Sequence, residues 1–297
     1  MNSTEKKGRR HPDWIRASLV RTGRGGDVRG ALAGGGLHTV CEEARCPNRG
    51  ECWDAGTATF LIMGAVCTRN CRYCSVRHGK PEPPDPDEPG RVARAAKKLG
   101  CRYVVVTSVT RDDLPDGGAE HFAAVVRELK NEITGVGVEL LVPDFSGDEK
   151  AVLTVADACP DVFGHNIETV SRRFPEVRPQ GSYRRSLSLL GFLSRERPGM
   201  VLKSGLMAGL GESRAEITEA LGDLRATGVQ IVTVGQYLQP SRESAPVDRY
   251  LRPEEFEEIR EEAVAMGFAS AVCGPLVRSS YHAEEASRAY NGSVADK

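Results

Sequence analysis

The feature that most restricts the fold of this chain is a regular alternation of short apolar segments with amphipathic ones. The apolar, β-branched segments have the length of buried strands and are residues 57–66, 101–108, 137–143, 161–167, 200–207 and 229–238. Helical periodicity marks residues 90–100, 119–132, 182–196 and 213–228, and a last helix begins at Pro253. Strands joined by helices pair in parallel, and right-handed crossovers curl such a sheet. The sequence therefore predicts an α/β fold, a partial (β/α)6 TIM-type barrel.

A length of 297 residues is within the usual range of one α/β barrel with appendages. We expect an N-terminal extension over residues 1–56, the barrel over residues 57–273 and a C-terminal extension over residues 274–297. Both extensions are expected to cover the barrel mouth. The glycine-rich residues 22–36 are interpreted as a loop, and the proline-rich residues 79–90 as an extended connector.

Charge and hydropathy exclude some classes of partner. The formal net charge is -1, so no overall field would hold the chain on nucleic acid or on an anionic membrane. The N-terminus is polar and basic without an apolar signal core, and no stretch approaches the roughly 20 apolar residues of a spanning helix. We therefore expect a cytoplasmic protein that binds neither nucleic acid nor membrane.

The cysteines are the strongest indication of chemistry, because nine of them are not expected to form disulfides in a reducing compartment. Six fall into two triads: Cys41, Cys46 and Cys52 in C-x4-C-x5-C, and Cys67, Cys71 and Cys74 in C-x3-C-x2-C. Structural zinc is closed by four ligands, whereas three thiolates suit a four-iron cluster whose remaining iron binds another group. A zinc site completed by a distant histidine is the alternative that the spacing leaves open.

The remaining cysteines, Cys101, Cys159 and Cys273, are isolated and are interpreted as small buried hydrophobic residues. Polar or glycine-rich sequence follows each predicted strand, beginning with the triad at residues 67–74 after the first strand. Because barrel active sites form at the carboxyl ends of the strands, this concentration at one end predicts the position of a site.

The second triad carries a family resemblance. Its sequence CTRNCRYC resembles the signature of radical S-adenosylmethionine enzymes and directly follows the first predicted strand. The resemblance implies a 4Fe-4S cluster on these cysteines, whose open iron chelates the methionine part of S-adenosylmethionine, and a 5′-deoxyadenosyl radical formed by reductive cleavage. Tyr73 stands where phenylalanine is more usual and is expected to pack on the adenine side.

The rest of the chain resembles one family, the lipoyl synthases. The motifs that carry the resemblance run in order from about residue 38 to residue 283: TVCEEARCPNRGECW, TSVTRDDLPDGGAEHF, HNIETV, VRPQGSYRRSL, KSGLMAGLGE, GQYLQPS and GPLVRSSYHA. The resemblance implies a second, auxiliary 4Fe-4S cluster on Cys41, Cys46 and Cys52, whose own sulfides are inserted into the substrate and which is consumed. It also implies that Ser280, from the R-S-S-Y motif, is the fourth ligand of that cluster.

The resemblance further implies the substrate and the partners. The substrate would be an octanoyl chain in amide linkage to a lysine of a lipoyl carrier domain, as in 2-oxoacid dehydrogenase E2 subunits and the glycine cleavage H protein. An electron donor such as flavodoxin or ferredoxin would supply the reductant.

The candidate contacts to the cofactor are polar residues at the ends of predicted strands. Thr107 and Ser108 end the second strand, where related enzymes bind the methionyl amino group, and Asn166, Glu168 and Lys203 are placed at later strand ends. For each, a satisfied polar group at a strand terminus is the alternative.

Three other polar residues have a structural interpretation. His165 is interpreted as a hydrogen-bonded core residue. Asp112 and Asp113 are interpreted as backbone caps of the segment that follows them.

Two alternative functions remain at this level. A second radical enzyme would insert sulfur as biotin synthase does, which gives no reason for the upstream triad, or would methylthiolate a macromolecule, which normally needs an added domain. A zinc-stabilised binding protein without catalysis belongs to a different class. Iron content separates the two-cluster enzyme from the zinc protein, since two clusters require roughly eight irons per chain.

Overall fold

The computed structural model describes residues 11–15, 25–54, 59–287 and 290. An eight-stranded sheet forms its centre, in the order β1-β2-β5-β6-β7-β8-β9-β10. Its strands are β1 (His38–Thr39), β2 (Thr59–Ile62), β5 (Tyr103–Ser108), β6 (Gly137–Leu141), β7 (Val162–Gly164), β8 (Leu202–Ala208), β9 (Ile231–Gln236) and β10 (Ser270–Gly274). All neighbours pair in parallel except β1 and β2, which are antiparallel. Within the described residues β1 and β10 are the two edges, so the barrel is partial.

All six predicted strands are confirmed. The structure adds β10 as a seventh parallel strand of the described sheet, together with the short β1. Two further short strands, β3 (Val66–Cys67) and β4 (Arg77–His78), pair with each other and enclose the second cysteine triad. Only one residue of β10 is fully buried, whereas the other parallel strands are mostly buried.

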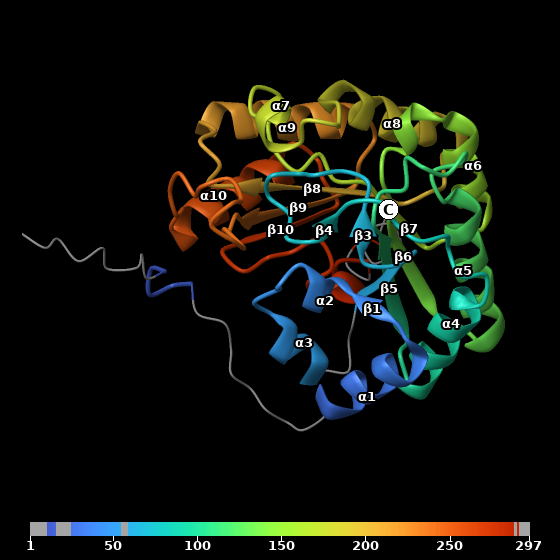
Figure 1. Cartoon of the computed structure of the whole chain (residues 1–297). Coiled ribbons are helices and arrows are strands. Elements are labelled where there is room, and N and C mark those ends of the chain that lie inside the picture. Colours follow the sequence, from blue (N-terminus) through green and yellow to red (C-terminus); the bar gives the residue numbers. More distant parts are fainter. Residues whose placement is uncertain (1–10, 16–24, 55–58, 288–289, 291–297) are drawn as a thin grey trace, which may run out of the picture.

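Helices cover the outer face of the sheet (Figure 1). They are α1 (Gly25–Gly35), α2 (Val40–Glu43), α3 (Arg49–Asp54), α4 (Glu88–Lys98), α5 (Ala119–Glu132), α6 (Glu149–Asp157), α7 (Phe174–Val177), α8 (Tyr183–Glu196), α9 (Arg214–Ala226) and α10 (Pro253–Ala265). In Figure 1, α4, α5, α6, α8 and α9 follow one another around the sheet, and α1 to α3 lie together beside β1. The predicted helices are confirmed, and the helical crossover α6 was missed.

Local sequence signals account for where these helices begin. Ser213 and Glu216 form a capping box at the start of α9, which satisfies backbone N–H groups that would otherwise lack a partner. Ser182 caps α8 in a similar way by accepting from the N–H of Arg185. Pro253 opens α10, where its missing N–H costs nothing.

Two predictions about irregular segments are wrong in part. The glycine-rich residues 22–36 contain the helix α1, although glycine disfavours helices. Val28 and Leu32 of this helix are buried in the main core, so tertiary packing outweighs propensity. The connector at residues 79–90 ends earlier than predicted, because Glu88 and Pro89 form the first turn of α4.

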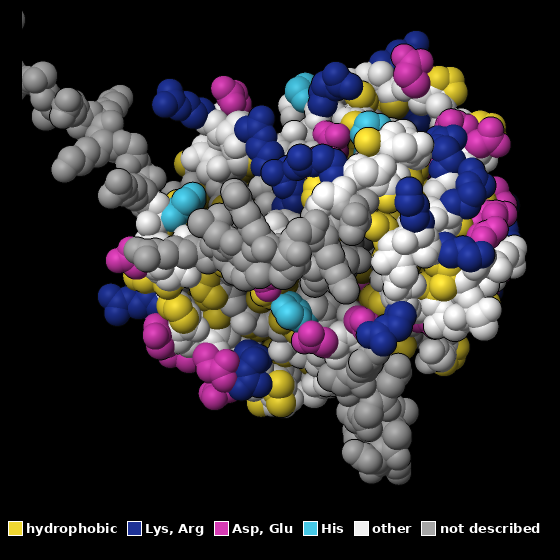
Figure 2. All heavy atoms as spheres, turned by 90° about the horizontal axis from the view of Figure 1, so that it is seen from below, with side chains coloured by type: hydrophobic (Ala, Val, Ile, Leu, Met, Phe, Trp, Pro, Cys, Tyr) yellow, Lys and Arg dark blue, Asp and Glu magenta, His cyan; other side chains and the backbone are white. Residues whose placement is uncertain are grey.

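The described surface carries both signs of charge. Figure 2 shows Lys and Arg side chains interspersed with Asp and Glu on the face seen from below, as the near-zero net charge suggests. In the part of the chain that the structure describes, no helix combines the length and the apolar character needed to cross a bilayer.

Candidate functional site

A cavity of about 510 Å³ lies at the carboxyl ends of the strands. The strand register brings these ends together, since Ile62 pairs with Ser108 and Ala208 with Gln236. Predicted site residues that line the cavity are Cys41, Cys46, Cys74, Tyr73, Thr107, Ser108, Asn166, Glu168 and Ser280. The polar loops thus gather around one cavity at one end of the sheet.

The loop of the second triad is held by backbone hydrogen bonds to sulfur. Cys67 ends β3, and its Sγ accepts from the N–H groups of Arg69 at 3.4 Å and Thr110 at 3.3 Å. Cys74 Sγ accepts from the N–H of Val76 at 3.4 Å. Such N–H to sulfur contacts stabilise the thiolate form that binds metal.

Burial favours the protonated form of the Cys71 and Cys74 thiols. It raises the pKa of Cys71 to about 11 and that of Cys74 to about 12, and the charges of the other thiols add to the rise. Metal ligands must be deprotonated, so iron binding here would release protons. The interactions between these thiols also show that the three side chains lie close to one another.

The first triad sits on the two short helices α2 and α3. Thr39 caps α2 by accepting from the N–H of Glu42, which places Cys41 within the helix, and Cys52 lies in α3. Burial, together with the charges of Cys41 and Cys46, raises the pKa of Cys52 to about 12. These three thiols therefore also form one group.

One hydrogen bond joins the two triad loops directly. Ser75, which follows Cys74, donates its hydroxyl to the carbonyl of Glu43 at 2.5 Å. Both triads contribute to the lining of the same cavity. A molecule in the cavity can therefore face both groups of cysteines at once.

The C-terminal segment is fastened to the first triad. Asn48 donates to the carbonyl of Leu276 at 2.7 Å, and the Tyr281 hydroxyl donates to Glu51 at 2.9 Å. Ser280 lies between these attachments, on the cavity wall. The neighbouring Ser279 accepts a hydrogen bond from Asn166 Nδ2 at 2.6 Å, which attaches the C-terminal segment to the end of β7.

The donor sets fit iron–sulfur clusters by their chemistry. Two groups of three soft thiolates, buried or partly buried, match the ligands that such clusters use, and Cys41, Cys46 and Cys74 of these groups line the cavity. Among the described residues, no group of three His, Cys, Asp or Glu side chains is arranged to hold a single metal ion.

The predicted cofactor contacts differ in how free their polar atoms are. Thr107 donates its hydroxyl to the carbonyl of Leu141 at 2.7 Å, so it is already engaged. Ser108 Oγ is buried at the cavity wall without a hydrogen-bond partner among the described residues. A buried hydroxyl without a partner is a place where a ligand can bind.

An arginine that the sequence analysis did not name lies among these residues. Arg178 donates to the carbonyl of Asn166 at 3.1 Å, and its Nε is buried without a partner in the described part of the chain. Burial raises the pKa of Glu168, which Arg178 and hydrogen bonds from Asn166 and Tyr73 oppose. The motif VRPQGSYRRSL contains Arg178, but only the fold brings it beside Glu168 and Cys71.

Glu168 also has an unusual backbone. Its φ of 67° is in the left-handed region that non-glycine residues seldom adopt. The surrounding sheet fixes this conformation, since its N–H donates to Gly205 and its carbonyl accepts from Met207. Strained backbone of this kind is concentrated at binding and catalytic sites.

The placement of Lys203 at a carboxyl strand end is wrong. It is the second residue of β8, and its Nζ donates to Glu139 at 2.7 Å within the barrel. Both side chains are 3% exposed. Glu139 in turn accepts from the Tyr103 hydroxyl at 2.9 Å. Lys203 is thus a partner in a buried network and does not line the cavity.

We expect Lys203→Met to destabilise the apoprotein by about 3–5 kcal/mol, because it leaves the Glu139 charge buried and unpaired. Lys97→Met is the matched control, since Lys97 forms an exposed pair with Glu132 and such pairs contribute about 0–1 kcal/mol. Denaturant unfolding followed by circular dichroism measures both. Equal losses of stability in the two variants would contradict the assignment of Lys203 to a buried ion pair with Glu139.

The structure also shows the surroundings of His165, Asp112 and Asp113, which the sequence analysis interpreted as structural residues. His165 is a buried core residue as predicted, bonded to Val142 O and Ser186 Oγ, and burial lowers its pKa to about 4. The interpretation of Asp112 and Asp113 as backbone caps is wrong, because Asp112 pairs with Arg69 and Asp113 with Arg111.

The three isolated cysteines are also not all buried. Cys159 is exposed, and Cys101 and Cys273 are partly buried. The prediction that all three act as small buried hydrophobic residues is therefore wrong for Cys159.

Comparison with known proteins shows the family and the fold. Residues 61–224 match the model of the radical SAM superfamily. The fold is similar to SuiB of Streptococcus suis, with a TM-score of 0.56 at 12% identity over 76% of this chain and 52% of that one. It is also similar to HydG, a maturase of the [FeFe]-hydrogenase, with a TM-score of 0.54 at 16% identity over 77% and 58% of the two chains.

Curated sequences resemble the chain over nearly its whole length. A lipoyl synthase of Rubrobacter xylanophilus is 51% identical over 95% of this chain and 88% of its own. Lipoyl synthases of Methylococcus capsulatus and Proteus mirabilis are 54% and 50% identical, each over 93% of this chain and 86% of their own. With its cavity at the strand ends and its cysteine triads, the chain belongs to the lipoyl synthase family of radical S-adenosylmethionine enzymes.

Proposed function

We propose that this enzyme inserts two sulfur atoms into an octanoyl chain bound to a lysine of a carrier domain, and that its two triads have separate tasks. Cys67, Cys71 and Cys74 would hold the cluster that binds S-adenosylmethionine, and the first triad an auxiliary cluster. The observation that carries the proposal is the single cavity onto which both triad loops open. Ser75, bonded to Glu43, fixes the spacing between the loops.

When bound, the two clusters and S-adenosylmethionine would supply a 5′-deoxyadenosyl radical on one side of the cavity and sulfide on the other. The chain itself would orient the substrate and exclude water. Apolar side chains of Leu61, Leu141 and Leu206 line the cavity and suit an alkyl chain, which they would hold by burial.

Five residues are proposed to bind S-adenosylmethionine. Within the described part of the chain, Ser108 offers a hydroxyl without a partner, and Glu168 a partly buried carboxylate and Asn166 an amide also lie at the cavity wall. Arg178 adds a buried guanidinium whose Nε has no partner among the same residues, which suits the methionyl carboxylate. Tyr73 follows Cys71 by two residues and would pack beside the adenine.

Replacing Arg178 by lysine is expected to raise the KM for S-adenosylmethionine by roughly 10-fold or more, because a point charge cannot reproduce two parallel hydrogen bonds. The rate of 5′-deoxyadenosine formation at saturating cofactor should change less. Arg173→Lys is the control, since Arg173 pairs with Glu176 in α7 and does not line the cavity. An unchanged KM in Arg178→Lys would remove this residue from the site.

For the auxiliary cluster, we propose Ser280 as the ligand that completes Cys41, Cys46 and Cys52. It lies on the cavity wall between two attachments of the C-terminal segment to the first triad loop. Burial lowers the pKa of Arg278, and the neighbouring Cys46 raises it, so the start of the R-S-S-Y motif also lies near that triad.

The proposed parts of the chain follow from these roles. Residues 1–56 would carry the auxiliary triad, residues 57–273 the barrel, and residues 274–297 the segment that closes the auxiliary site. The boundary at residues 56 and 57 lies outside the described residues.

The proposed partners are octanoylated carrier domains, such as 2-oxoacid dehydrogenase E2 subunits and the glycine cleavage H protein. A flavodoxin or ferredoxin would donate electrons. Because the net charge is only -1, local complementarity around the cavity would guide the docking of the carrier.

An anaerobic assay tests the function. The enzyme is purified without oxygen, its iron is counted, and it is given reductant, S-adenosylmethionine and an octanoylated carrier domain. We expect roughly eight irons per chain, 5′-deoxyadenosine and thiolated carrier, whereas free octanoate should give little product. A colourless zinc protein, or intact clusters that yield no thiolated carrier, would contradict the proposal.

A further inference from the structure

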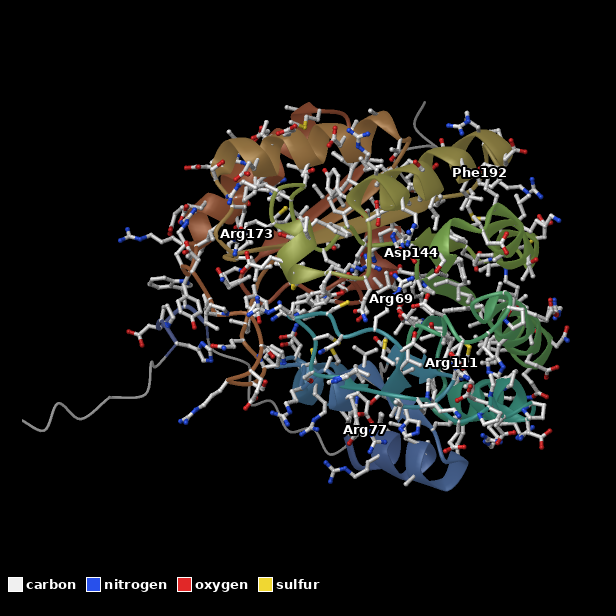
Figure 3. The ribbon with its side chains drawn as sticks, turned by 45° about the horizontal axis from the view of Figure 1, so that its top comes forward. Arg69, Arg77, Arg111, Asp144, Arg173 and Phe192 are labelled. Carbon is white, nitrogen blue, oxygen red and sulfur yellow. The ribbon has the colours of Figure 1, made fainter. Side chains whose placement is uncertain are left out.

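Arg69 is a buried arginine within the second triad, between Cys67 and Cys71. Its side chain is 2% exposed. The guanidinium donates to Asp112 through Nε and Nη2, both at 2.7 Å, and Nη2 also lies 2.7 Å from Asp144. Figure 3 shows Arg69 next to Asp144 near the middle of the molecule.

This arrangement joins three loops of the barrel mouth. Arg69 belongs to the triad loop, Asp112 to the loop after β5, and Asp144 to the loop after β6. Ser146 strengthens the contact by donating to Asp112 at 3.1 Å. Ser146 and Phe145 both have positive φ, 52° and 44°, so the loop after β6 holds a strained conformation around the guanidinium.

The charges of this group are balanced. Asp144 is fully buried and also pairs with Arg185 at 3.2 Å, so two arginines face two aspartates. The hydrogen bonds and charge of Arg69 hold the pKa of Asp144 below its usual range, against the effect of burial. Removing either charge of the central pair would therefore leave an uncompensated charge beside the triad.

Arg69 also contacts a thiol of the triad. The Arg69 N–H donates to Cys67 Sγ at 3.4 Å. Nη1 of Arg69 is buried and has no partner among the described residues, which leaves one donor beside the triad free for a group bound there.

We infer that Arg69 is a positioning residue. Together with Asp112 and Asp144, it holds the second triad loop in the conformation that binds the cluster and sets the charge around that cluster. The inference rests on the proposed function, because it assumes that Cys67, Cys71 and Cys74 hold a cluster. Residues that hydrogen-bond to metal ligands and orient them affect the affinity for the metal, and charges near a cluster change its reduction potential.

The test uses the full chain with both clusters loaded, and compares Arg69→Gln, Asp112→Asn and the double variant. Arg69→Gln should lower the reduction potential of the cluster that binds S-adenosylmethionine, and Asp112→Asn should raise it, while the double variant returns toward the original value. Iron loss from this cluster to a chelator should become on the order of 10–100 times faster in Arg69→Gln. Electron paramagnetic resonance at controlled potentials measures the first effect and absorbance the second.

Arg111 and Asp113 provide a matched control. Arg111 is 1% exposed and donates to Asp113 through Nε and Nη2, both at 2.8 Å, in the same loop as Asp112. Arg111→Gln and Asp113→Asn should leave the potential and the iron loss close to those of the unaltered enzyme. Figure 3 shows Arg111 apart from Arg69.

The outcomes separate this inference from the function beneath it. If the unaltered enzyme holds no cluster on the second triad, the proposed function fails. If it holds one and the Arg69 and Asp112 variants match the control variants, the positioning inference fails. Should Arg69→Gln not fold, Asp112→Asn decides, since a potential no higher than in Asp113→Asn overturns the inference.

Discussion

Replacing Cys67, Cys71 and Cys74 by alanine should abolish cleavage of S-adenosylmethionine. These thiols lie close together on one loop held by backbone hydrogen bonds to sulfur, and without them no iron remains to bind the cofactor. We expect 5′-deoxyadenosine to fall below detection while roughly four irons per chain remain. Liquid chromatography of the nucleoside, together with iron analysis, measures both.

The triple alanine variant of Cys41, Cys46 and Cys52 is the matched comparison. It should retain part of the cleavage of S-adenosylmethionine but form no thiolated carrier, because the source of sulfide is lost. Circular dichroism establishes that both variants are folded. Equal loss of cleavage in the two folded variants would show that the triads do not have separate tasks.

Ser280→Cys should keep or strengthen the auxiliary cluster and yet strongly reduce thiolation. A hard oxygen donor is a weaker partner for iron than a soft thiolate, so serine leaves one corner of the cluster easy to open. Cysteine would close that corner. Iron retention against a chelator, compared with the yield of thiolated carrier, measures the two effects, which we expect to move in opposite directions.

Two further variants control for position. Ser280→Ala should weaken the auxiliary cluster and lower the yield of product. Ser279→Ala removes an acceptor from the Asn166 amide, a loss of about 1 kcal/mol, and should affect thiolation less. Full product formation by Ser280→Ala with an intact auxiliary cluster would show that this serine is not the labile ligand.

Periodicity and spacing along the chain were enough to predict much of this protein. The six central strands are rich in apolar residues because both of their faces are covered, and this pattern is visible without a structure even where Glu139 and Lys203 interrupt it. The grouping of the cysteines is likewise local, since each triad lies within one short loop or helix pair. The short β10 and the glycine-rich α1 were missed because their formation depends on packing against distant parts of the chain.

The sequence by itself determined the barrel class, the two triads and the family resemblance. Each of these depends on short stretches of sequence: the apolar strands, the cysteine spacings and the family motifs. Only the tertiary structure decided which polar residues face the cavity. It turned Lys203 toward Glu139, brought Arg178 beside Glu168 and joined Asp112 to Arg69. The physical reason is that a buried charge must find its partner in space, and these partners come from different loops or strands, which periodicity and local spacing do not relate.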